Sequence, residues 1–368
     1  GSSPRARGTP SPSYHDDAVP AEILTPPGLA GEIAEYHNGT AFRDCPVYGV
    51  VASLACMSAL AGGRYALEMP AGPSSTNLFI IALGETGTGK EGPRTVVKNV
   101  LKIAGNNKAE TSAASDVGLL KKLSVKRDAI WINDEFGRYL KSAANPNGGH
   151  QFALISQVMK LYGLALSSTE ERSYADSKKS LPAIERPYLS VLATTTGKSV
   201  TDAMSSEEIV GGTLNRFIVI SNGDPEPPFR NGKTAEMSAK LKSGIKRFSE
   251  NAVPSNVVPD EGPNNPVGFR VERHISITPT DDAVEALIAY RDEADAKRAK
   301  AGGAAAHLWA RSYENALRVA GCVAIGDSDP RNPILTLENA LWAITFMRWS
   351  SMGTIPPRQL PTGATSVT

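Results

Sequence analysis

The sequence predicts an α/β protein in which a parallel sheet lies between helices. Several short, nearly continuous apolar runs have the length of strands that are buried on both faces of a sheet. Segments with helical spacing separate these runs, and the 368 residues, 41% hydrophobic and 21% charged, have the composition of a globular protein. The runs that predict strands are residues 77–83, 129–134, 188–196 and 217–221.

The chain length predicts two or three folding units at roughly 150 residues per domain. Stretches rich in Pro, Gly, Ser or Asn mark the expected boundaries. The expected parts are a disordered leader (1–18), an N-terminal helical region (19–70), an α/β core (71–228), a linker or insertion (229–268), a mostly helical C-terminal lid (269–352) and a flexible tail (353–368).

Charge and cysteine content exclude several classes of protein. Lys plus Arg number 39 and Asp plus Glu number 38, so contact with nucleic acid must come from a local patch or loop. The three cysteines form no disulfide framework or metal motif, and this fits a reducing cytoplasm. Residues 45–63 carry no charge and approach the length of a membrane span. They are rich in Ala, Gly and Ser, however, and this composition predicts a buried helix rather than a membrane span.

A glycine-rich turn follows the first predicted strand and precedes a helical segment at 95–103. Its residues are Gly84, Glu85, Thr86, Gly87, Thr88, Gly89, Lys90 and Glu91, which match the GxxxxGK pattern of a phosphate-binding loop (P-loop). In such a loop, backbone N–H groups surround phosphate oxygens and the lysine reaches the β and γ phosphates. The sequence therefore predicts an ATP site with Mg²⁺.

Glu91 stands where the P-loop pattern has Ser or Thr, whose hydroxyl normally binds Mg²⁺. Three alternatives are open. Glu91 holds the metal or its water shell, or it turns away and the metal relies on Asp134, or the turn is structural or no longer supports hydrolysis.

The second predicted strand ends in two adjacent carboxylates, Asp134 and Glu135, in the arrangement called Walker B. Asp134 is expected to hold the Mg²⁺ shell, and Glu135 to orient a water for attack on the γ-phosphate. Two acids at a strand end also occur as a solvated turn. The preceding P-loop favours the catalytic interpretation, because parallel strands place both motifs at the same edge of the sheet.

Two further groups could complete such a site. The third predicted strand ends in Thr195 and Thr196, either of which could sense the γ-phosphate, although threonine is also an ordinary strand residue. Arg216 precedes the fourth strand and could act as an arginine finger in a neighbouring subunit; the alternative is a surface arginine at a helix end.

The order of GETGTGKE, IWINDEFG, ATTTG and GGTLNRFIVI resembles AAA+ ATPases of the pre-sensor-1 hairpin clade, the superfamily 3 type above all. More narrowly, GKEGPR and DEFG resemble phage and mobile-element helicase-like proteins. The likeness covers residues 77–221. Superfamily 3 helicases usually have Asn at the position of Thr196, whereas Arg216 with Phe217 matches the pair that holds the trans-acting finger in superfamily 3 and MCM helicases.

The resemblance implies two more sets of site residues. That clade grips DNA with a hairpin before the sensor strand, here residues 169–180, although by composition this segment is a solvated loop. The expected DNA contacts are Arg172, Tyr174, Lys178 and Lys179. Arg311 lies in a segment similar to the MCM helix that bears a second sensor arginine, where it would touch a γ-phosphate; alternatively it is a helix-surface arginine.

Together these likenesses imply an AAA+ type P-loop ATPase that assembles into a ring, expected to be a hexamer, and unwinds DNA. Replication of a phage or mobile element in a bacterial host cytoplasm, with a primase or other replication protein as a possible partner, is the expected setting. Two alternatives remain open: a loader, packaging motor or protein remodeller, and a non-hydrolysing, nucleotide-gated assembly module. No membrane contact is expected.

Overall fold

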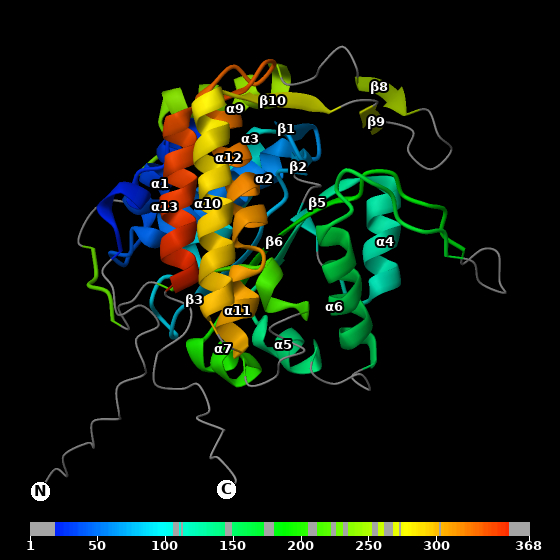
Figure 1. The fold of residues 1–368 in the computed structure, drawn as a ribbon, viewed down its shortest axis with the longest axis horizontal. Helices are drawn as coiled ribbons and strands as arrows, with labels where there is room; N and C mark the ends of the chain where they lie inside the picture. The colour runs from blue at the N-terminus through cyan, green and yellow to red at the C-terminus, as the bar shows by residue number, and fades with distance from the viewer. Residues whose placement is uncertain are drawn as a thin grey trace, which may run out of the picture.

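The computed structural model describes residues 19–105, 110–111, 113–143, 149–172, 180–204, 212–221, 226–230, 235–251, 257–260, 268–271, 274–301 and 303–352. A parallel sheet lies in the middle of the molecule (Figure 1). On one side of it lie α10 (Asp281–Lys300), α12 (Ser312–Asp327) and α13 (Leu337–Met352), and on the other α4 (Asp116–Val125) and α6 (Gly149–Tyr162). This is the α/β class that the sequence predicts.

The central sheet of the described residues has five parallel strands in the order β4-β5-β6-β3-β7. All four apolar runs of the sequence are among them, so the strand predictions are confirmed. The strands are β3 (Phe79–Leu83), β4 (Glu110–Thr111), β5 (Asp128–Asn133), β6 (Tyr188–Thr195) and β7 (Ile218–Ser221).

Helices cover both faces of this sheet and give two separate hydrophobic cores. One face packs on α4 (Asp116–Val125), α5 (Gly137–Ala143) and α6 (Gly149–Tyr162). The other packs on α2 (Val47–Ala61), α3 (Gly92–Ile103), α12 (Ser312–Asp327) and α13 (Leu337–Met352). Every residue of α2 is buried, as expected of a helix without charge. None of the described helices is long and apolar enough to cross a membrane.

A second sheet joins the two ends of the chain. Its order is β11-β10-β1-β2, and β1 runs parallel to β10 with Tyr65 opposite Ile275. The strands are β1 (Tyr65–Met69), β2 (Gly72–Ser75), β10 (Ile275–Pro279) and β11 (Ile334–Leu335). The sequence suggests separate regions at 19–70 and 269–352, but in the structure they share this sheet and one core, because strands this short must pair to satisfy their backbone groups.

The remaining elements complete this two-sheet arrangement. Helix α9 lies within the segment expected as a linker or insertion and contacts α1 and α3. The remaining bounds are η1 (Ala21–Leu24), α1 (Gly28–Thr40), α7 (Gly197–Met204), η4 (Leu214–Arg216), α9 (Ala239–Asn251), β8 (Val257–Asp260), β9 (Gly268–Val271), α10 (Asp281–Lys300) and α11 (Gly303–Trp309). Helix α10 begins directly after Thr280, its N-cap residue, with Asp281 and Asp282 in its first turn.

Candidate nucleotide site

The glycine-rich turn closes on itself between β3 and α3. Lys90 Nζ donates to the carbonyl of Gly84 at 2.8 Å, and Thr88 Oγ1 donates to the carbonyl of Glu85 at 2.9 Å. Gly87 and Gly89 have φ angles of +85° and +92°, which L side chains rarely adopt. The turn therefore has the strand-turn-helix setting that the phosphate-loop prediction requires, ahead of a helix N-terminus that favours an anion.

Tyr48 of α2 supports this turn from behind, a role that sequence reasoning missed. Its hydroxyl donates to the Leu83 carbonyl at 2.7 Å, and burial raises the pKa of that hydroxyl so that it stays a donor. A Cβ at Gly84 would lie 2.2 Å from Tyr48 Oη and 2.5 Å from Thr88 Oγ1. Only glycine fits at the end of β3. The only sign of this role in the sequence was that Tyr48 lies in the uncharged segment predicted to be a buried helix.

Strand register places the two carboxylates beside the turn. Strand β6 pairs with β3 and β5, with Thr195 opposite Leu83 and Ala193 opposite Asn133. Gly84 N donates to the Thr195 carbonyl at 3.2 Å, so the P-loop is attached to the strand that lies next to Walker B. The P-loop, Asp134, Glu135, Thr195 and Thr196 thus follow the carboxyl ends of adjacent strands, where ligands bind to open α/β sheets.

Each Walker B carboxylate is paired with an arginine for which the sequence predicted no site role. Arg94 Nη1 lies 3.1 Å from Asp134 Oδ2, and Arg138 Nη2 lies 2.7 Å from Glu135 Oε2. Arg94 comes from the first turn of α3, and Arg138 from the turn after Glu135. All four side chains are well exposed, so screening by water keeps these pairs weak and exchangeable.

The candidate metal ligands fit a Mg²⁺ site that is completed by phosphates and waters, and they do not form a site built of protein ligands alone. Asp134 is exposed at the strand end, and Glu91 is exposed beside Lys90, where it forms no ion pair with any described residue. No three His, Cys, Asp or Glu side chains gather into a metal cluster among the described residues. Mg²⁺ is usually held by one or two carboxylates together with phosphates and waters, which fits this donor set.

The two candidate sensor threonines both lie at this edge. Thr195 is buried, and its Oγ1 lies 2.9 Å from the position of a Cβ at Gly137, just beyond Glu135. The Thr196 hydroxyl lies 3.1 Å from the Ser199 hydroxyl. Both sensor assignments stay predictions.

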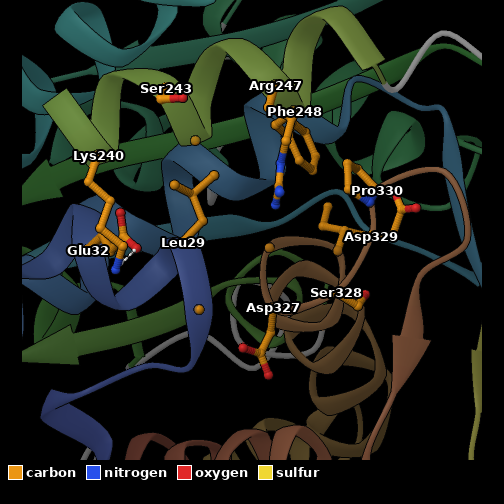
Figure 2. A pocket seen from close by; sticks show the side chains of 14 residues that line it. Leu29, Glu32, Lys240, Ser243, Arg247, Phe248, Asp327, Ser328, Asp329 and Pro330 are labelled. Atoms are coloured by element: carbon orange, nitrogen blue, oxygen red, sulfur yellow. Dashed lines mark ion pairs between the residues drawn. The ribbon is translucent and has the colours of Figure 1, made fainter.

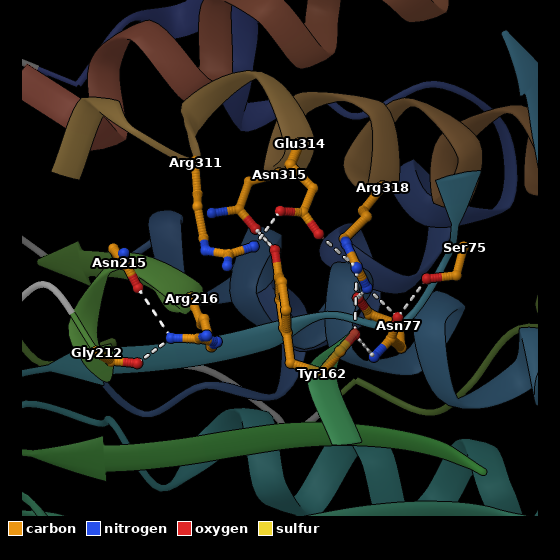
Figure 3. Close-up of polar contacts among 10 residues, drawn as sticks. All are labelled: Ser75, Asn77, Tyr162, Gly212, Asn215, Arg216, Arg311, Glu314, Asn315 and Arg318. Atoms are coloured by element: carbon orange, nitrogen blue, oxygen red, sulfur yellow. Dashed lines mark hydrogen bonds and ion pairs between the residues drawn. The ribbon is translucent and has the colours of Figure 1, made fainter. Parts of the chain in front are cut away.

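Arg216 and Arg311 lie together at the opposite edge of the sheet. Ile218 pairs with Ile80 in parallel register, so Arg216 lies at the amino end of β7 and Gly84 follows the carboxyl end of β3. Along the strand direction, Arg216 and Gly84 are therefore six residues of extended chain apart, which is about 20 Å. Figure 3 shows Arg216 and Arg311 on one side of the Tyr162 ring and Arg318 on the other.

The guanidinium of Arg216 has polar but no acidic partners at hydrogen-bond distance. It donates to the Gly212 carbonyl and, at 3.5 Å, to Asn215 Oδ1. Partial burial, followed by the nearby charge of Arg311, lowers the pKa of Arg216. Within the part of the chain that the structure describes, no ion pair balances Arg216. Two converging guanidinium groups of this kind suit a bound anion.

Arg311 is oriented by a network of charged side chains on α12, of which Arg318 is buried and Arg311 and Glu314 are partly exposed. Glu314 bonds Arg311 at 2.5 Å and Arg318 at 2.7 Å, and these two arginines hold the pKa of Glu314 below its usual value although burial raises it. Arg318 also donates to the carbonyls of Asn77 and Tyr162 at 3.1 and 3.2 Å. This network ties α12 to the amino edge of the sheet (Figure 3).

The expected DNA hairpin is only partly described. Backbone bonds of 2.9 Å in both directions between Arg172 and Leu181, and a bridge between Ser168 and Glu185, form an antiparallel stem. The Arg172 side chain pairs with Asp116 at 2.7 Å and with Gln157, so it fixes the stem to α4 and α6 rather than pointing to a ligand. The other predicted contacts, Tyr174, Lys178 and Lys179, lie outside the described residues.

A cavity of about 570 Å³ lies between α1, α9 and the segment after α12 (Figure 2). Lys240 on its rim pairs with Glu32 at 2.7 Å, and the lining also holds Arg247 together with the two acidic residues Asp327 and Asp329. Such a balanced lining does not suit a triphosphate, and no residue of the P-loop takes part. This cavity is separate from the candidate nucleotide site.

Comparison with known proteins gives likenesses in structure but none in sequence. No protein-family model matches the chain, and no curated protein matches it in sequence. The solved structure of a full-length MCM homolog from Methanopyrus kandleri is similar over 92% of this chain and 63% of that one, with a TM-score of 0.45 and 12% sequence identity. The chain thus spans less than two thirds of that protein's length.

Proposed function

We propose that this chain is an AAA+ ATPase whose active sites form between neighbouring copies in a ring, expected to be a hexamer. One observation carries the proposal: the P-loop and Walker B acids follow the carboxyl ends of the strands, whereas Arg216 and Arg311 lie about 20 Å away at the amino end. No arginine side chain spans that distance. Arg216 can reach a γ-phosphate only if it belongs to another copy.

In this proposal the turn from Gly84 to Lys90 binds the phosphates of ATP through its N–H groups and the Lys90 ammonium. Asp134, with Glu91 as a second candidate, holds Mg²⁺, which neutralises phosphate charge. Glu135, released from Arg138, orients a water for attack on the γ-phosphate. A neighbour's Arg216 stabilises the charge that develops in the transition state.

The work done with this energy is proposed to be DNA unwinding in the replication of a phage or mobile element, with a primase or other replication protein as a possible partner. Support comes from the antiparallel stem between Walker B and the sensor strand, at the place of the DNA-gripping hairpin in the clade that the sequence resembles. Strand displacement that requires ATP tests this. ATP turnover without displacement favours a loader, packaging motor or remodeller.

The test of the shared site is a mixing experiment. Lys90→Ala removes the phosphate-binding side of each interface, and Arg216→Ala removes the arginine side, so each variant alone is expected to be inactive. A one-to-one mixture restores both sides at about a quarter of the interfaces. Lys90→Ala mixed with Glu135→Gln, two changes on the same side, is the matched control and recovers no activity.

Failure of the first mixture to recover turnover, together with a monomeric mass, overturns the shared site. A second candidate function is the nucleotide-gated assembly module, favoured by the arginine pairing of both Walker B carboxylates. Unchanged turnover in Glu135→Gln would support it, because the hydrolysis measured would then not come from this site.

A further inference from the structure

An exposed aromatic ring lies directly beside the P-loop and has no assigned role. The Arg43 guanidinium sits 3.4 Å from the centroid of the Phe229 ring, and Arg43 Nε donates to the carbonyl of Gly87 at 3.1 Å. Arg43 Nη1 donates to the Pro227 carbonyl at 2.7 Å. Phe229 is nevertheless 65% exposed. One arginine thus links the rim of the phosphate loop to a ring that stays open to solvent.

The backbone fixes which side chains share that face. Arg43 and Phe229 form an antiparallel bridge, flanked by bonds from Asp44 N to the Pro228 carbonyl and from Arg230 N to the Phe42 carbonyl, both at 2.9 Å. Opposed residues of such a pair lie on one face, and their chain neighbours lie on the other. The ion pair of Asp44 with Arg230, at 2.8 Å, is on that other face.

We propose that Phe229, backed by Arg43, is the stacking platform for the base of the nucleotide whose phosphates the P-loop binds. The proposal rests on the function proposed above. When the P-loop holds the phosphates of a nucleotide, the ribose and base extend beyond the rim of the loop. Arg43 connects this rim to the Phe229 ring, because it bonds the Gly87 carbonyl and lies over the ring. Aromatic stacking on a base is favourable and tolerates every base, since each has a π-face.

The contacts of Arg43 and Phe229 also indicate which nucleotides would bind. Among the described residues, the hydrogen bonds of Arg43 go to backbone carbonyls, and a phenyl ring offers no hydrogen bond to the edge of a base. The platform therefore selects by ring area: purine nucleotides bind better than pyrimidine nucleotides, and adenine and guanine bind alike. A protein partner fits this surface poorly, because one ring beside a charged pair is far smaller than the roughly 800 Å² that a stable interface buries on each partner.

The experiment compares ADP with inorganic pyrophosphate, since pyrophosphate has the phosphates but no base. Calorimetric titration of the wild type and of Phe229→Ala, both with Mg²⁺, separates the two contributions. Phe229→Ala is expected to weaken ADP binding about tenfold and to leave pyrophosphate binding unchanged. Phe229→Trp restores ADP binding, and wild-type protein binds GDP as well as ADP but CDP several-fold more weakly.

The matched control is Phe42→Ala. Phe42 is 57% exposed and one residue from Arg43, but it lies on the opposite face of the bridge, so ADP affinity stays at the wild-type level. Equal ADP affinity in wild type and Phe229→Ala overturns the platform while leaving the P-loop site intact. Wild-type protein that binds neither ADP nor pyrophosphate overturns the proposed function, and the platform with it.

Discussion

Arg318 gives the strongest stability prediction in the molecule. Only 4% of this arginine is exposed, and its guanidinium bonds the Glu314 carboxylate at 2.7 Å and the carbonyls of Asn77 and Tyr162 at 3.1 and 3.2 Å. It also lies 4.0 Å from the centroid of the Tyr162 ring. A buried charge held in this way links α12 to the start of β3 and the end of α6.

Arg318→Met keeps much of the apolar stem and removes the charged head. Breaking a buried ion pair costs about 3–5 kcal/mol, because a charge and its polar partners are left unsatisfied. Glu314 is one-third exposed and keeps Arg311 as a partner, so the lower end applies. We expect the free energy of unfolding to fall by about 3 kcal/mol.

Urea unfolding of the wild type, Arg318→Met and the control Arg311→Met measures this difference. Arg311 is partly exposed and makes a surface-type pair, so its loss should cost at most about 1 kcal/mol. A cost below 1 kcal/mol for Arg318→Met, or equal costs for the two variants, would refute the division of α12 into a structural arginine and an arginine available to a ligand.

Three further changes test the surroundings of the P-loop. Burial lowers the pKa of His37 to about 4, so the unfolded state binds one more proton than the folded state between pH 4 and about 6.5. The free energy of unfolding therefore decreases as the pH is lowered through this range, by up to about 1.4 kcal/mol per pH unit. Urea unfolding at pH 7 and at pH 5 should show a smaller decrease in His37→Gln than in the wild type, and equal decreases contradict this. Arg94→Ala frees Asp134, so the Mg²⁺ concentration for half-maximal ADP binding should drop by up to about fivefold; no drop means that the pair does not compete with the metal. Gly84→Ala forces a Cβ against Tyr48 Oη and should abolish ADP binding, with a loss of about 1–3 kcal/mol in the free energy of unfolding. Adding Tyr48→Phe should recover part of that stability. Wild-type ADP affinity in Gly84→Ala alone would contradict the close contact between Gly84 and Tyr48.

Local pattern was enough to predict the strands that build the candidate site. Residues 77–83 and 188–196 are continuous apolar runs because the strands they form, β3 and β6, are covered by helices on both faces. The glycines at 87 and 89 mark left-handed backbone, which is also a local property. Motif order along the chain then predicted that the phosphate loop and the acids share an edge.

Partners that are distant in sequence were not predictable in this way. Nothing in the sequence near β1 specifies its pairing with β10, more than 200 residues later, so the two ends of the chain were expected to be separate regions. Arg172 shows the same limit. The resemblance grouped it with the hairpin lysines by its place in the segment 169–180, but its side chain pairs with Asp116, which lies on α4. Long-range pairing depends on the completed fold and leaves no local signal.

Charge balance gives a second argument for a site shared between copies. The charged side chains gathered at the carboxyl edge cancel: Glu85, Glu91, Asp134 and Glu135 against Arg43, Lys90, Arg94 and Arg138. A triphosphate adds several negative charges to a surface that is already neutral, and Mg²⁺ offsets only part of them. The loop N–H groups and the N-terminus of α3 compensate a further part, and cations from outside this edge would supply the rest. Arg216 and Arg311 are cations that converge with no acidic partner for Arg216 among the described residues, and they lie on the edge that a neighbouring copy would have to present.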